Sequence, residues 1–317
     1  MKVALVHDYL KEYGGAERVL ESLHEIWPKA SIYTLVYIPK RLGPHQKRIK
    51  EWDIHPLIPR WIPLISKLIS PLRLIAPCFF KRLELTDYDV VIISATGAYN
   101  PNLIRTKPGA HYCYCHTPPR YLYGLPTARE WKKHWWIRIP AEITNHFLRL
   151  VDFRSAQKVD FFIANSKNTA ARIEKFYRRK AKVIYPPVEI PEVSIAKRSR
   201  NGQKYFLAGG RLARPKRLDL AIKACNQLKL FLKVYGKVFA GYGEELERIA
   251  GPTIEFLGEV NEQELARLYA GCQTFIFPAE EEDFGIVPVE AMSYGKPIIA
   301  LRQGGVVESV IEGKTGE

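Results

Sequence analysis

Two glutamates, Glu282 and Glu290, stand eight positions apart in the last part of the sequence. An ionised carboxylate only accepts hydrogen bonds, so such a pair suits a ligand that offers hydrogen-bond donors. The apolar run 274–278 predicts a buried parallel strand, and 286–294 predicts a helix with Pro288 in its first turn. We therefore expect Glu282 in a loop at the carboxyl edge of a sheet, where open α/β sheets bind ligands. Glu290 would lie inside the helix that follows.

The spacing of the glutamates alone leaves two interpretations open. The run 280–283 is acidic, and most acidic runs are solvated surface. The flanking sequence favours a binding role instead, because the start of a helix offers unpaired backbone N–H groups to an anion or a sugar hydroxyl. The residues at this predicted helix start are Phe284, Gly285, Ile286 and Val287.

The segment from Glu282 to Glu290 resembles the E-x7-E signature of the large retaining glycosyltransferase family 4. The resemblance extends into 296–300 and the pair Gly304–Gly305, where that family places its next strand and a glycine-rich loop. It implies an α/β fold of the GT-B type, with two Rossmann-like, doubly wound parallel-sheet domains that face each other across a cleft.

A second motif contains two cations after a predicted strand. Two glycines, Gly209 and Gly210, follow the strand, and Arg211 and Lys216 precede a helix with apolar periodicity. Two fixed cations can neutralise a leaving nucleoside diphosphate and so lower the barrier to its departure. Ordinary solubilising charge is the alternative interpretation, above all for Arg214 and Arg217. The resemblance selects Arg211 and Lys216, which occupy the Gly-Arg-Leu…Lys positions of the family.

The first predicted strand is followed by the glycine pair Gly14–Gly15, which opens a helix and would let the backbone approach a ligand closely. In the resembled family such a loop contacts the diphosphate and sugar of the donor. There is no GxGxxG motif, which argues against a dehydrogenase. His116 follows the predicted strand 110–115, and a lone histidine there is more often structural. By the resemblance it would line the cleft and orient substrate by hydrogen bonding, with Tyr9 and Arg120 as candidates for acceptor binding.

The resemblance also assigns roles. Glu282 would hold hydroxyls of the donor sugar, Glu290 the ribose diol, and the backbone around Gly258 and Val260 the nucleobase. It implies retention at the anomeric carbon, with the leaving phosphate accepting the acceptor proton. Two cations would take the place of a metal ion, so neither a metal nor a cofactor is expected. The predicted catalytic residues are His116, Arg211, Lys216 and Glu282, and the predicted donor-binding residues are Gly14, Gly15, Gly210, Gly258, Val260, Phe284, Gly285, Ile286, Val287 and Glu290.

Strand-like apolar runs alternate with helical segments along the chain, which predicts two doubly wound parallel sheets. We expect an acceptor-binding domain at 1–187, a polar linker at 188–203 and a donor-binding domain at 204–317. Members of the resembled family normally continue for several more elements, so the C-terminal domain is expected to be truncated. The predicted strands are 3–7, 31–37, 89–94, 110–115, 161–165 and 182–185, followed by 204–208, 230–235, 253–257, 274–278 and 297–301.

The formal charge of the chain is unevenly distributed. Residues 1–187 hold 31 Lys and Arg against 15 Asp and Glu, a net +16, whereas 188–317 hold 17 against 18, a net −1. A basic domain favours anionic partners such as lipid headgroups or a pyrophosphate-linked acceptor. The segment 52–85 is apolar but interrupted by five prolines, too often for a transmembrane helix. It is either an amphipathic element on an anionic membrane surface or a broken helical pair inside the domain. The aromatic-basic cluster 131–136 is likewise either part of such an interface or an acceptor-binding or packing surface.

These patterns predict a glycosyltransferase that moves a hexosyl group from a nucleotide-diphosphate sugar to a lipid-linked or polysaccharide acceptor. The pattern around 6–20 resembles a mannosyltransferase-like branch of surface-polysaccharide assembly, so GDP-mannose is the donor that we expect first. The alternative donor is a UDP-sugar, for the transfer of a glucosyl, galactosyl or N-acetylglucosaminyl group. A cytoplasmic location at the membrane periphery follows. Rival hypotheses are an epimerase or phosphorylase of the same fold, a binding-only remnant, and a basic membrane- or nucleic-acid-binding protein without catalysis. We expect no nucleic-acid partner, because no helix-turn-helix, zinc-finger or RNP motif is present.

Overall fold

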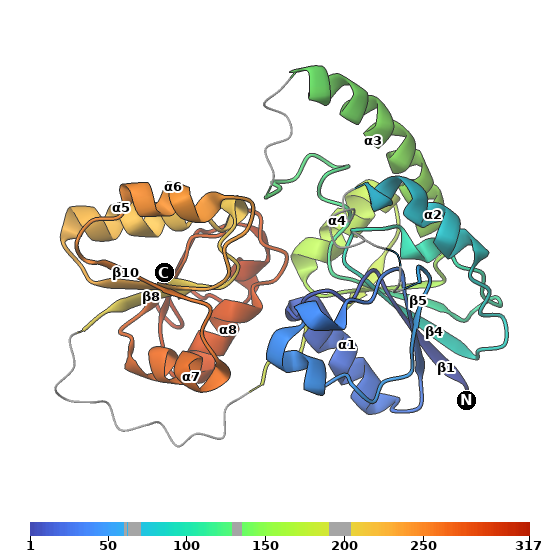
Figure 1. Cartoon of the computed structure of the whole chain (residues 1–317), viewed down its shortest axis with the longest axis horizontal. Helices are drawn as coiled ribbons and strands as arrows, with labels where there is room; N and C mark the ends of the chain where they lie inside the picture. The colour runs from blue at the N-terminus through green and yellow to red at the C-terminus, as the bar shows by residue number, and fades with distance from the viewer. Residues whose placement is uncertain (60–61, 63–70, 129–134, 190–203) are drawn as a thin grey trace. The chain divides into compact units, whose positions relative to one another are not determined.

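The computed structural model describes residues 1–59, 62, 71–128, 135–189 and 204–317. The chain forms two compact units (Figure 1). Unit 1 comprises 1–125 with 134–187, and unit 2 comprises 126–133 with 188–317. The division expected from the sequence differs in assigning 126–133 to the first domain, and most of the expected linker lies outside the described residues.

Unit 1 contains a seven-stranded sheet in which all paired strands are parallel. The strand order is β3-β2-β1-β4-β5-β6-β7, so successive strands are added to one side of β1 and then, from β4, to the other. Every strand predicted for this half is present, and β3 was missed because it is short and lies in the proline-rich segment 52–85. The strands are β1 (Val3–His7), β2 (Ser31–Thr34), β3 (Ile54–Pro56), β4 (Val90–Ala95), β5 (His111–Cys115), β6 (Phe161–Ala164) and β7 (Ala181–Val183).

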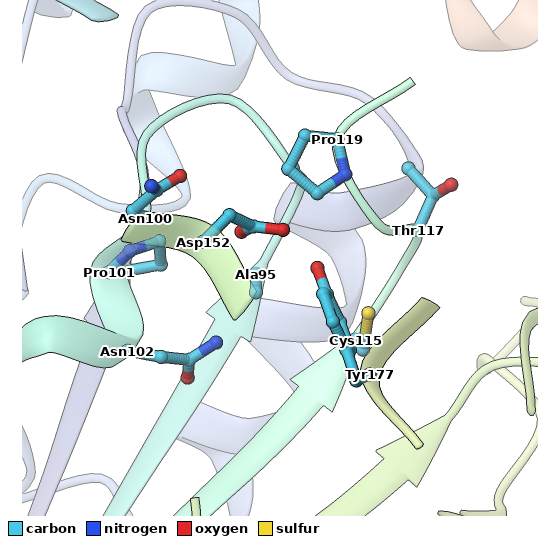
Figure 2. A pocket seen from close by; sticks show the side chains of 10 residues that line it. Ala95, Asn100, Pro101, Asn102, Cys115, Thr117, Pro119, Asp152 and Tyr177 are labelled. Carbon is cyan, nitrogen blue, oxygen red and sulfur yellow. The ribbon is translucent and has the colours of Figure 1, made fainter. Parts of the chain in front are cut away.

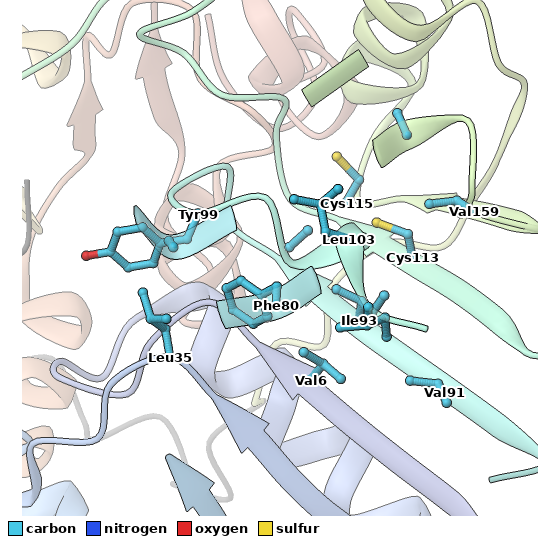
Figure 3. Packing of buried hydrophobic residues seen from close by; sticks show 14 of the residues in the cluster. Val6, Leu35, Phe80, Val91, Ile93, Tyr99, Leu103, Cys113, Cys115 and Val159 are labelled. Carbon is cyan, nitrogen blue, oxygen red and sulfur yellow. The ribbon is translucent and has the colours of Figure 1, made fainter. Parts of the chain in front are cut away.

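Both faces of this sheet are buried, as expected for a parallel sheet covered by helices. Ala4 and Val6 of β1 face one apolar core, whereas Val3 and Leu5 face the other. Figure 3 shows the first core, in which Phe80 packs beside the strands. The helices of unit 1 are α1 (Gly15–Ile26), α2 (Leu72–Arg82), α3 (Trp135–Ala156) and α4 (Lys167–Tyr177), with the 3-10 turns η1 (Pro39–Arg41), η2 (Gly43–Lys47) and η3 (Pro101–Leu103).

The segment 52–85 is only partly described, because 60–61 and 63–70 lie outside the described residues. Its last part forms α2, which contains Pro77 and buries Leu72, Ala76 and Phe80 in the core of unit 1. The opposite face leaves Leu74 and Ile75 exposed. One face of α2 therefore packs inside the domain, while Leu74 and Ile75 are exposed on the other.

Unit 2 contains a five-stranded parallel sheet in the order β10-β9-β8-β11-β12. Its five strands match the predicted runs. Helices α5 and α6 pack on one face, and α7 and α8 on the other (Figure 1). The elements are β8 (Phe206–Gly209), η5 (Arg214–Lys216), α5 (Leu218–Leu228), β9 (Leu232–Tyr235), α6 (Tyr242–Ile249), β10 (Ile254–Gly258), α7 (Glu262–Gly271), β11 (Phe275–Phe277), α8 (Ile286–Ser293), β12 (Ile298–Ala300) and η6 (Gly304–Glu308).

The two sheets share one topological feature that positions loops. In each, the chain reverses its direction of strand addition beside the first strand: between β1 and β4 in unit 1, and between β8 and β11 in unit 2. At such a switch point the loops after the two strands diverge, and open α/β sheets bind ligands there. In the part of the chain that is described, no helix combines the length and apolar character needed to cross a bilayer.

Candidate functional site

Lys216 and Glu282 meet at the switch point of unit 2. Lys216 lies in η5 after β8, and Glu282 lies in the loop after β11. Lys216 Nζ is 2.8 Å from Glu282 Oε2, and both side chains retain about a fifth of their exposure, at 22% and 20%. The same ammonium lies 5.0 Å from the centre of the Phe277 ring. The structure thus brings together one predicted cation and one predicted carboxylate as a partly buried ion pair.

Backbone contacts fix the two loops that carry this pair. The N–H of Glu280 donates to the carbonyl of Pro215 at 2.7 Å, which joins the η5 turn to the loop after β11. From the other side, Gly305 N donates to the carbonyl of Glu282 at 2.8 Å. A Cβ on Gly305 would lie 2.0 Å from the Asp283 carbonyl oxygen, so a side chain cannot fit there. The pair Gly304–Gly305, predicted to form a glycine-rich loop, therefore supports the backbone of Glu282.

Glu290 lies in α8, the helix that follows the Glu282 loop. Tyr269 donates its hydroxyl to Glu290 Oε2 at 3.4 Å, and its oxygen lies 2.7 Å from that of Tyr235. Tyr269 extends from α7 and Tyr235 from β9, so α7 contacts this carboxylate directly and β9 acts on it only through Tyr269. The helix begins after Gly285, which has a φ of 92°, a left-handed conformation that favours glycine. As predicted, α8 places Glu290 in its second turn.

The other predicted donor-binding residues lie on neighbouring loops at the carboxyl edge. A Cβ on Gly236 would lie 1.7 Å from the carbonyl oxygen of Gly210, so the loops after β8 and β9 touch through their backbones. Gly236 N also donates to the carbonyl of Gly258 at 2.7 Å. Arg211 is exposed, and its guanidinium lies 5.7 Å from the Phe239 ring. Val260 packs on the core that contains α7 and α8. This edge consists largely of backbone, which suits close approach of a nucleotide.

In unit 1, His116 ends a buried chain of polar contacts at the switch point. His116 Nε2 is 2.9 Å from Ser94 Oγ, and Ser94 Oγ is 3.0 Å from His7 Nδ1. On its far side, His7 Nε2 lies 3.5 Å from Glu17 Oε1. The other carboxylate oxygen of Glu17 accepts a hydrogen bond from Gly14 N at 2.9 Å. The predicted histidine and glycine loop are therefore connected through three residues that sequence reasoning missed.

The environment of His116 fixes its protonation state. Burial, followed by the charge of His7, lowers the pKa of His116 to about 3, so the ring is neutral at physiological pH. The nearby carboxylate of Asp8 accepts hydrogen bonds from the backbone N–H of Thr96 and, at 2.8 Å, from that of Tyr99. Those bonds tie the loop after β4 to the loop after β1. The one signal in the sequence was the pair His7–Asp8 directly after the first strand.

The predicted acceptor-binding residues follow two different strands of unit 1. Tyr9 follows β1, donates its hydroxyl to Glu12 at 3.1 Å and packs edge-on against Tyr99. Arg120 is partly buried in the turn after β5, and its carbonyl accepts from Leu125 N at 3.1 Å. Both lie on loops at the carboxyl edge of the sheet.

A narrow pocket in unit 1 lies between the ends of β4 and β5, where Ala95 and Cys115 contribute to its wall (Figure 2). Asp152 of α3 and Tyr177 of α4 line it. Burial raises the pKa of Asp152 to about 7, although hydrogen bonds from Tyr123, at 2.8 Å, and from Tyr177 oppose the rise. Asn100 also lines the pocket, and its buried Nδ2 makes no hydrogen bond to any described residue.

The raised pKa of Asp152 predicts a specific pH dependence of stability. The folded state keeps its proton up to about pH 7, whereas the unfolded state releases it near the ordinary value of 3.8. Between these values the folded state binds more protons, so this residue's contribution to stability falls as pH rises, by up to about 4 kcal/mol. We expect Asp152→Asn to remove that fall. Denaturant unfolding at several pH values measures this: the free energy of unfolding of Asp152→Asn, relative to that of the wild type, should increase from pH 4 to 7. The control Asp87→Asn, at an exposed aspartate, should show no such increase. If the free energies of unfolding of Asp152→Asn and the wild type changed in parallel with pH, the assignment would be wrong.

One Asp-x-Asp sequence, Asp87-Tyr88-Asp89, occurs in the chain. It precedes β4, at the amino edge of the sheet rather than the carboxyl edge. Asp89 accepts hydrogen bonds there from Lys2 N at 2.7 Å and from Lys107 Nζ at 2.8 Å. This motif therefore lies at the opposite edge of the unit 1 sheet from the loops that carry Tyr9 and His116.

Two family models match the chain in succession. The model described as Glycosyltransferase Family 4 matches 13–191, more than half of the chain, and the model described as Glycosyl transferases group 1 matches 190–317. Among curated relatives, the alpha-1,3/1,6-mannosyltransferase ALG2 of Dictyostelium discoideum is 26% identical over 378 residues, covering 100% of this chain and 85% of that protein. ALG2 of Mus musculus is 25% identical and covers 96% and 80%.

Solved structures support the same fold. Anabaena HepE, in complex with UDP, aligns with a TM-score of 0.68 at 20% identity, covering 100% of this chain and 85% of that one. Sucrose-phosphate synthase of Thermosynechococcus elongatus aligns with a TM-score of 0.70 at 17% identity, with the same coverage. The predicted fold class, two parallel-sheet Rossmann-like α/β domains, is confirmed. The chain belongs to glycosyltransferase family 4 and is a glycosyltransferase of the GT-B type.

Proposed function

We propose that this enzyme transfers a mannosyl group, with retention of anomeric configuration and without a metal ion, from GDP-mannose to a lipid-linked or polysaccharide acceptor. The observation that carries the proposal is the ion pair of Lys216 and Glu282 at the unit 2 switch point, with Glu290 in the helix that follows Glu282. It combines a cation for a diphosphate with two carboxylates for hydroxyl groups. A nucleotide sugar offers all of these in one molecule.

The diphosphate would bind along the glycine-lined edge of unit 2. Lys216 and Arg211 supply positive charge, and Gly210, which has no side chain, lets phosphate oxygens approach the backbone. Negative charge develops on the leaving diphosphate as the glycosidic bond breaks, and cations already in place stabilise it without reorganisation. These two residues would therefore perform the work that a metal ion does in other transferases.

The two carboxylates would recognise different hydroxyl groups. Glu282 and the backbone N–H groups of Phe284 to Val287, at the start of α8, would hold the hydroxyls of the donor sugar. Glu290, held by Tyr269, would accept both hydroxyls of the ribose, and the backbone at Gly258 and Val260 would meet the base. For retention, the leaving phosphate would take the proton of the attacking acceptor hydroxyl.

His116 would orient a substrate hydroxyl rather than remove a proton. A pKa of about 3 makes it a weak base. The carboxylate of Glu17 favours a proton on the facing Nε2 of His7, so we assign His7 Nδ1 as the acceptor of the Ser94 hydroxyl proton. Ser94 Oγ then accepts from the Nε2–H of His116. This tautomer leaves Nδ1 of His116 as a hydrogen-bond acceptor.

Substitution of Ser94 tests this chain of contacts. Ser94→Ala leaves nitrogens of His7 and His116 unpaired in a buried site, so we expect kcat/KM to fall about tenfold through mispositioning and unfolding to become easier by about 1–3 kcal/mol. Nitrogen NMR of the imidazoles should show a single Nε2–H tautomer of His116 in the wild type and a mixture in the variant. Ser155→Ala, a change at a buried serine whose hydroxyl donates to the Asp152 carbonyl, should keep activity and tautomer unchanged. An unaltered tautomer in Ser94→Ala would refute the role of Ser94.

Mannose is favoured because the ALG2 relatives span nearly all of this chain. A UDP-sugar is the second candidate, since Anabaena HepE was solved with UDP. Calorimetric titration with GDP-mannose, UDP-glucose, UDP-galactose and UDP-N-acetylglucosamine tests both. We expect GDP-mannose to bind most tightly and Glu290→Ala to weaken every nucleotide. Binding of none of these donors would refute the proposal, and preference for a UDP-sugar would replace the mannosyl assignment.

The acceptor and the location follow from charge. Residues 1–187 carry a net +16, which suits a lipid pyrophosphate acceptor and the anionic cytoplasmic face of a membrane. We propose a peripheral enzyme at that face. Transfer to a lipid-pyrophosphate acceptor should fall steeply when salt is raised, because screening weakens long-range attraction.

A further inference from the structure

An exposed apolar stripe runs along α3 of unit 1, the long green helix in Figure 1. Ile139, Ile143, Phe147 and Leu150 recur at intervals of three or four residues, which places them on one face of an α-helix. Their side chains are 57%, 57%, 62% and 44% exposed. Trp136, 60% exposed, extends the same face by one more turn. At 1.5 Å per residue, the stripe from 136 to 150 is about 21 Å long.

The opposite face of α3 accounts for the stability of the helix. Asn145, Leu148, Asp152 and Ala156 are buried against the rest of unit 1. Packing of that face is therefore complete without the stripe. Single exposed apolar residues are ordinary on protein surfaces, but a continuous row of large ones marks a site of contact.

Charge identifies the partner. Arg138 and Arg154 are exposed at the two ends of the stripe, and His146 is exposed beside it. Of the two acidic residues of α3, Asp152 is buried and Glu142 is only partly exposed. An apolar face edged by cations is the pattern of a helix that lies in the interface of an anionic bilayer, with cations at the level of the headgroups. A second copy of the same basic unit would instead bring like charges together, which opposes association.

We propose that the α3 stripe, Trp136 to Leu150, is the surface through which unit 1 docks on anionic lipid. This deepens the membrane location proposed above and rests on it. The helix would lie parallel to the bilayer, with Ile143 and Phe147 in the acyl boundary and Arg138 and Arg154 among the headgroups. On α2, exposed Leu74 and Ile75 with Lys81 and Arg82 form a smaller surface of the same chemistry, and both helices contact η3.

Vesicle sedimentation tests the docking surface. We expect the wild-type chain to bind vesicles of phosphatidylglycerol and phosphatidylcholine, and to bind pure phosphatidylcholine vesicles at least tenfold more weakly. The double substitution Ile143→Glu with Phe147→Glu should lower affinity for the anionic vesicles at least tenfold. The matched control is Ile26→Glu, which changes an apolar residue of unit 1 that is 64% exposed and ends α1. It should bind as the wild type does. A second variant, Arg138→Ala with Arg154→Ala, should weaken binding and reduce its salt dependence.

Three results would overturn the proposal. One is wild-type affinity in the Ile143→Glu, Phe147→Glu variant, and another is equal binding to neutral and anionic vesicles. The third is a wild-type chain that stays off vesicles but forms a dimer that this variant dissociates, which would assign the stripe to a second copy. Calorimetry of GDP-mannose binding, done without lipid, separates this proposal from the donor assignment, because the stripe variant should bind the nucleotide sugar as the wild type does.

Discussion

Lys216→Met should lower kcat/KM by about 10²- to 10³-fold, the largest loss that we expect from one side chain in unit 2. Removal of a fixed charge that stabilises a developing anion costs roughly 3–4 kcal/mol in transition-state stabilisation. Met keeps most of the length and apolar character of the side chain while it removes the ammonium and its contact with the Phe277 ring. Because the charge on the leaving phosphate grows during the reaction, kcat should fall more than the affinity for free GDP. Initial rates with GDP-mannose and calorimetry with GDP measure the two effects.

Glu282→Gln provides the informative comparison with Lys216→Met. In the structure Glu282 neutralises Lys216 at 2.8 Å. Loss of the negative charge should leave the cation available to phosphate, so GDP should bind as tightly as to the wild type or more tightly. Transfer should nevertheless fall about 10²-fold, because the carboxylate that would orient the sugar is lost. If GDP binding and transfer fell together in this variant, the division of roles between sugar and phosphate would be wrong.

Lys223→Met is the matched control for both variants. Lys223 lies on α5 of the same unit, its side chain is 63% exposed, and its ammonium is 3.8 Å from Asp219. Exposed ion pairs of this kind contribute little. Its removal changes the net charge of unit 2 by the same amount as Lys216→Met, so an equal loss of activity in the control would show that net charge, rather than the placed ammonium, matters.

Local sequence patterns were sufficient to predict the two sheets and the loops of unit 2. Buried parallel strands are continuous apolar runs, and each predicted run corresponds to a strand. The positions of Glu282 and Glu290 followed from the same logic, since a strand, a glycine turn and a short helix are encoded within about twenty consecutive residues. The strand β3 was missed because three residues, the last of them Pro56, carry too little periodic signal.

Contacts between distant segments were not predictable in this way. Ser94 lies 87 residues from His7 and 22 from His116, and nothing in its own neighbourhood distinguishes it from any polar residue in a strand. Only the order of strands, with β1 beside β4 and β4 beside β5, brings these residues together. The exposed stripe of α3 was missed for the opposite reason. Its apolar periodicity resembles that of a core-facing helix, and only the packed structure reveals which face is buried.

Gly305→Ala should reduce transfer about 10²-fold even though it changes no residue proposed to touch the substrate. A Cβ there would lie 2.0 Å from the carbonyl oxygen of Asp283 and 2.8 Å from Cα of Phe284. Both are backbone atoms, so the loop that carries Glu282 must move. A displacement of about 1 Å in a reacting group costs about 10²-fold in rate. The overpacking should also lower the free energy of unfolding by about 1–3 kcal/mol.

Gly313→Ala separates displacement of the site from general destabilisation. Gly313 has a φ of 72°, and no atom lies within 4 Å of the position that an added Cβ would take. Alanine there therefore adds backbone strain of about 1–3 kcal/mol without pushing on a neighbour. Denaturant unfolding should give comparable losses of stability for the two variants, but only Gly305→Ala should lose transfer activity. Because Lys216 is held by a different loop, GDP should bind Gly305→Ala within a few-fold of its wild-type affinity. Equal activity in the two glycine variants would mean that Gly304 and Gly305 do not determine the position of Glu282. The contact at 2.0 Å between the added Cβ and the Asp283 carbonyl oxygen would then be relieved by movement of the glycines themselves.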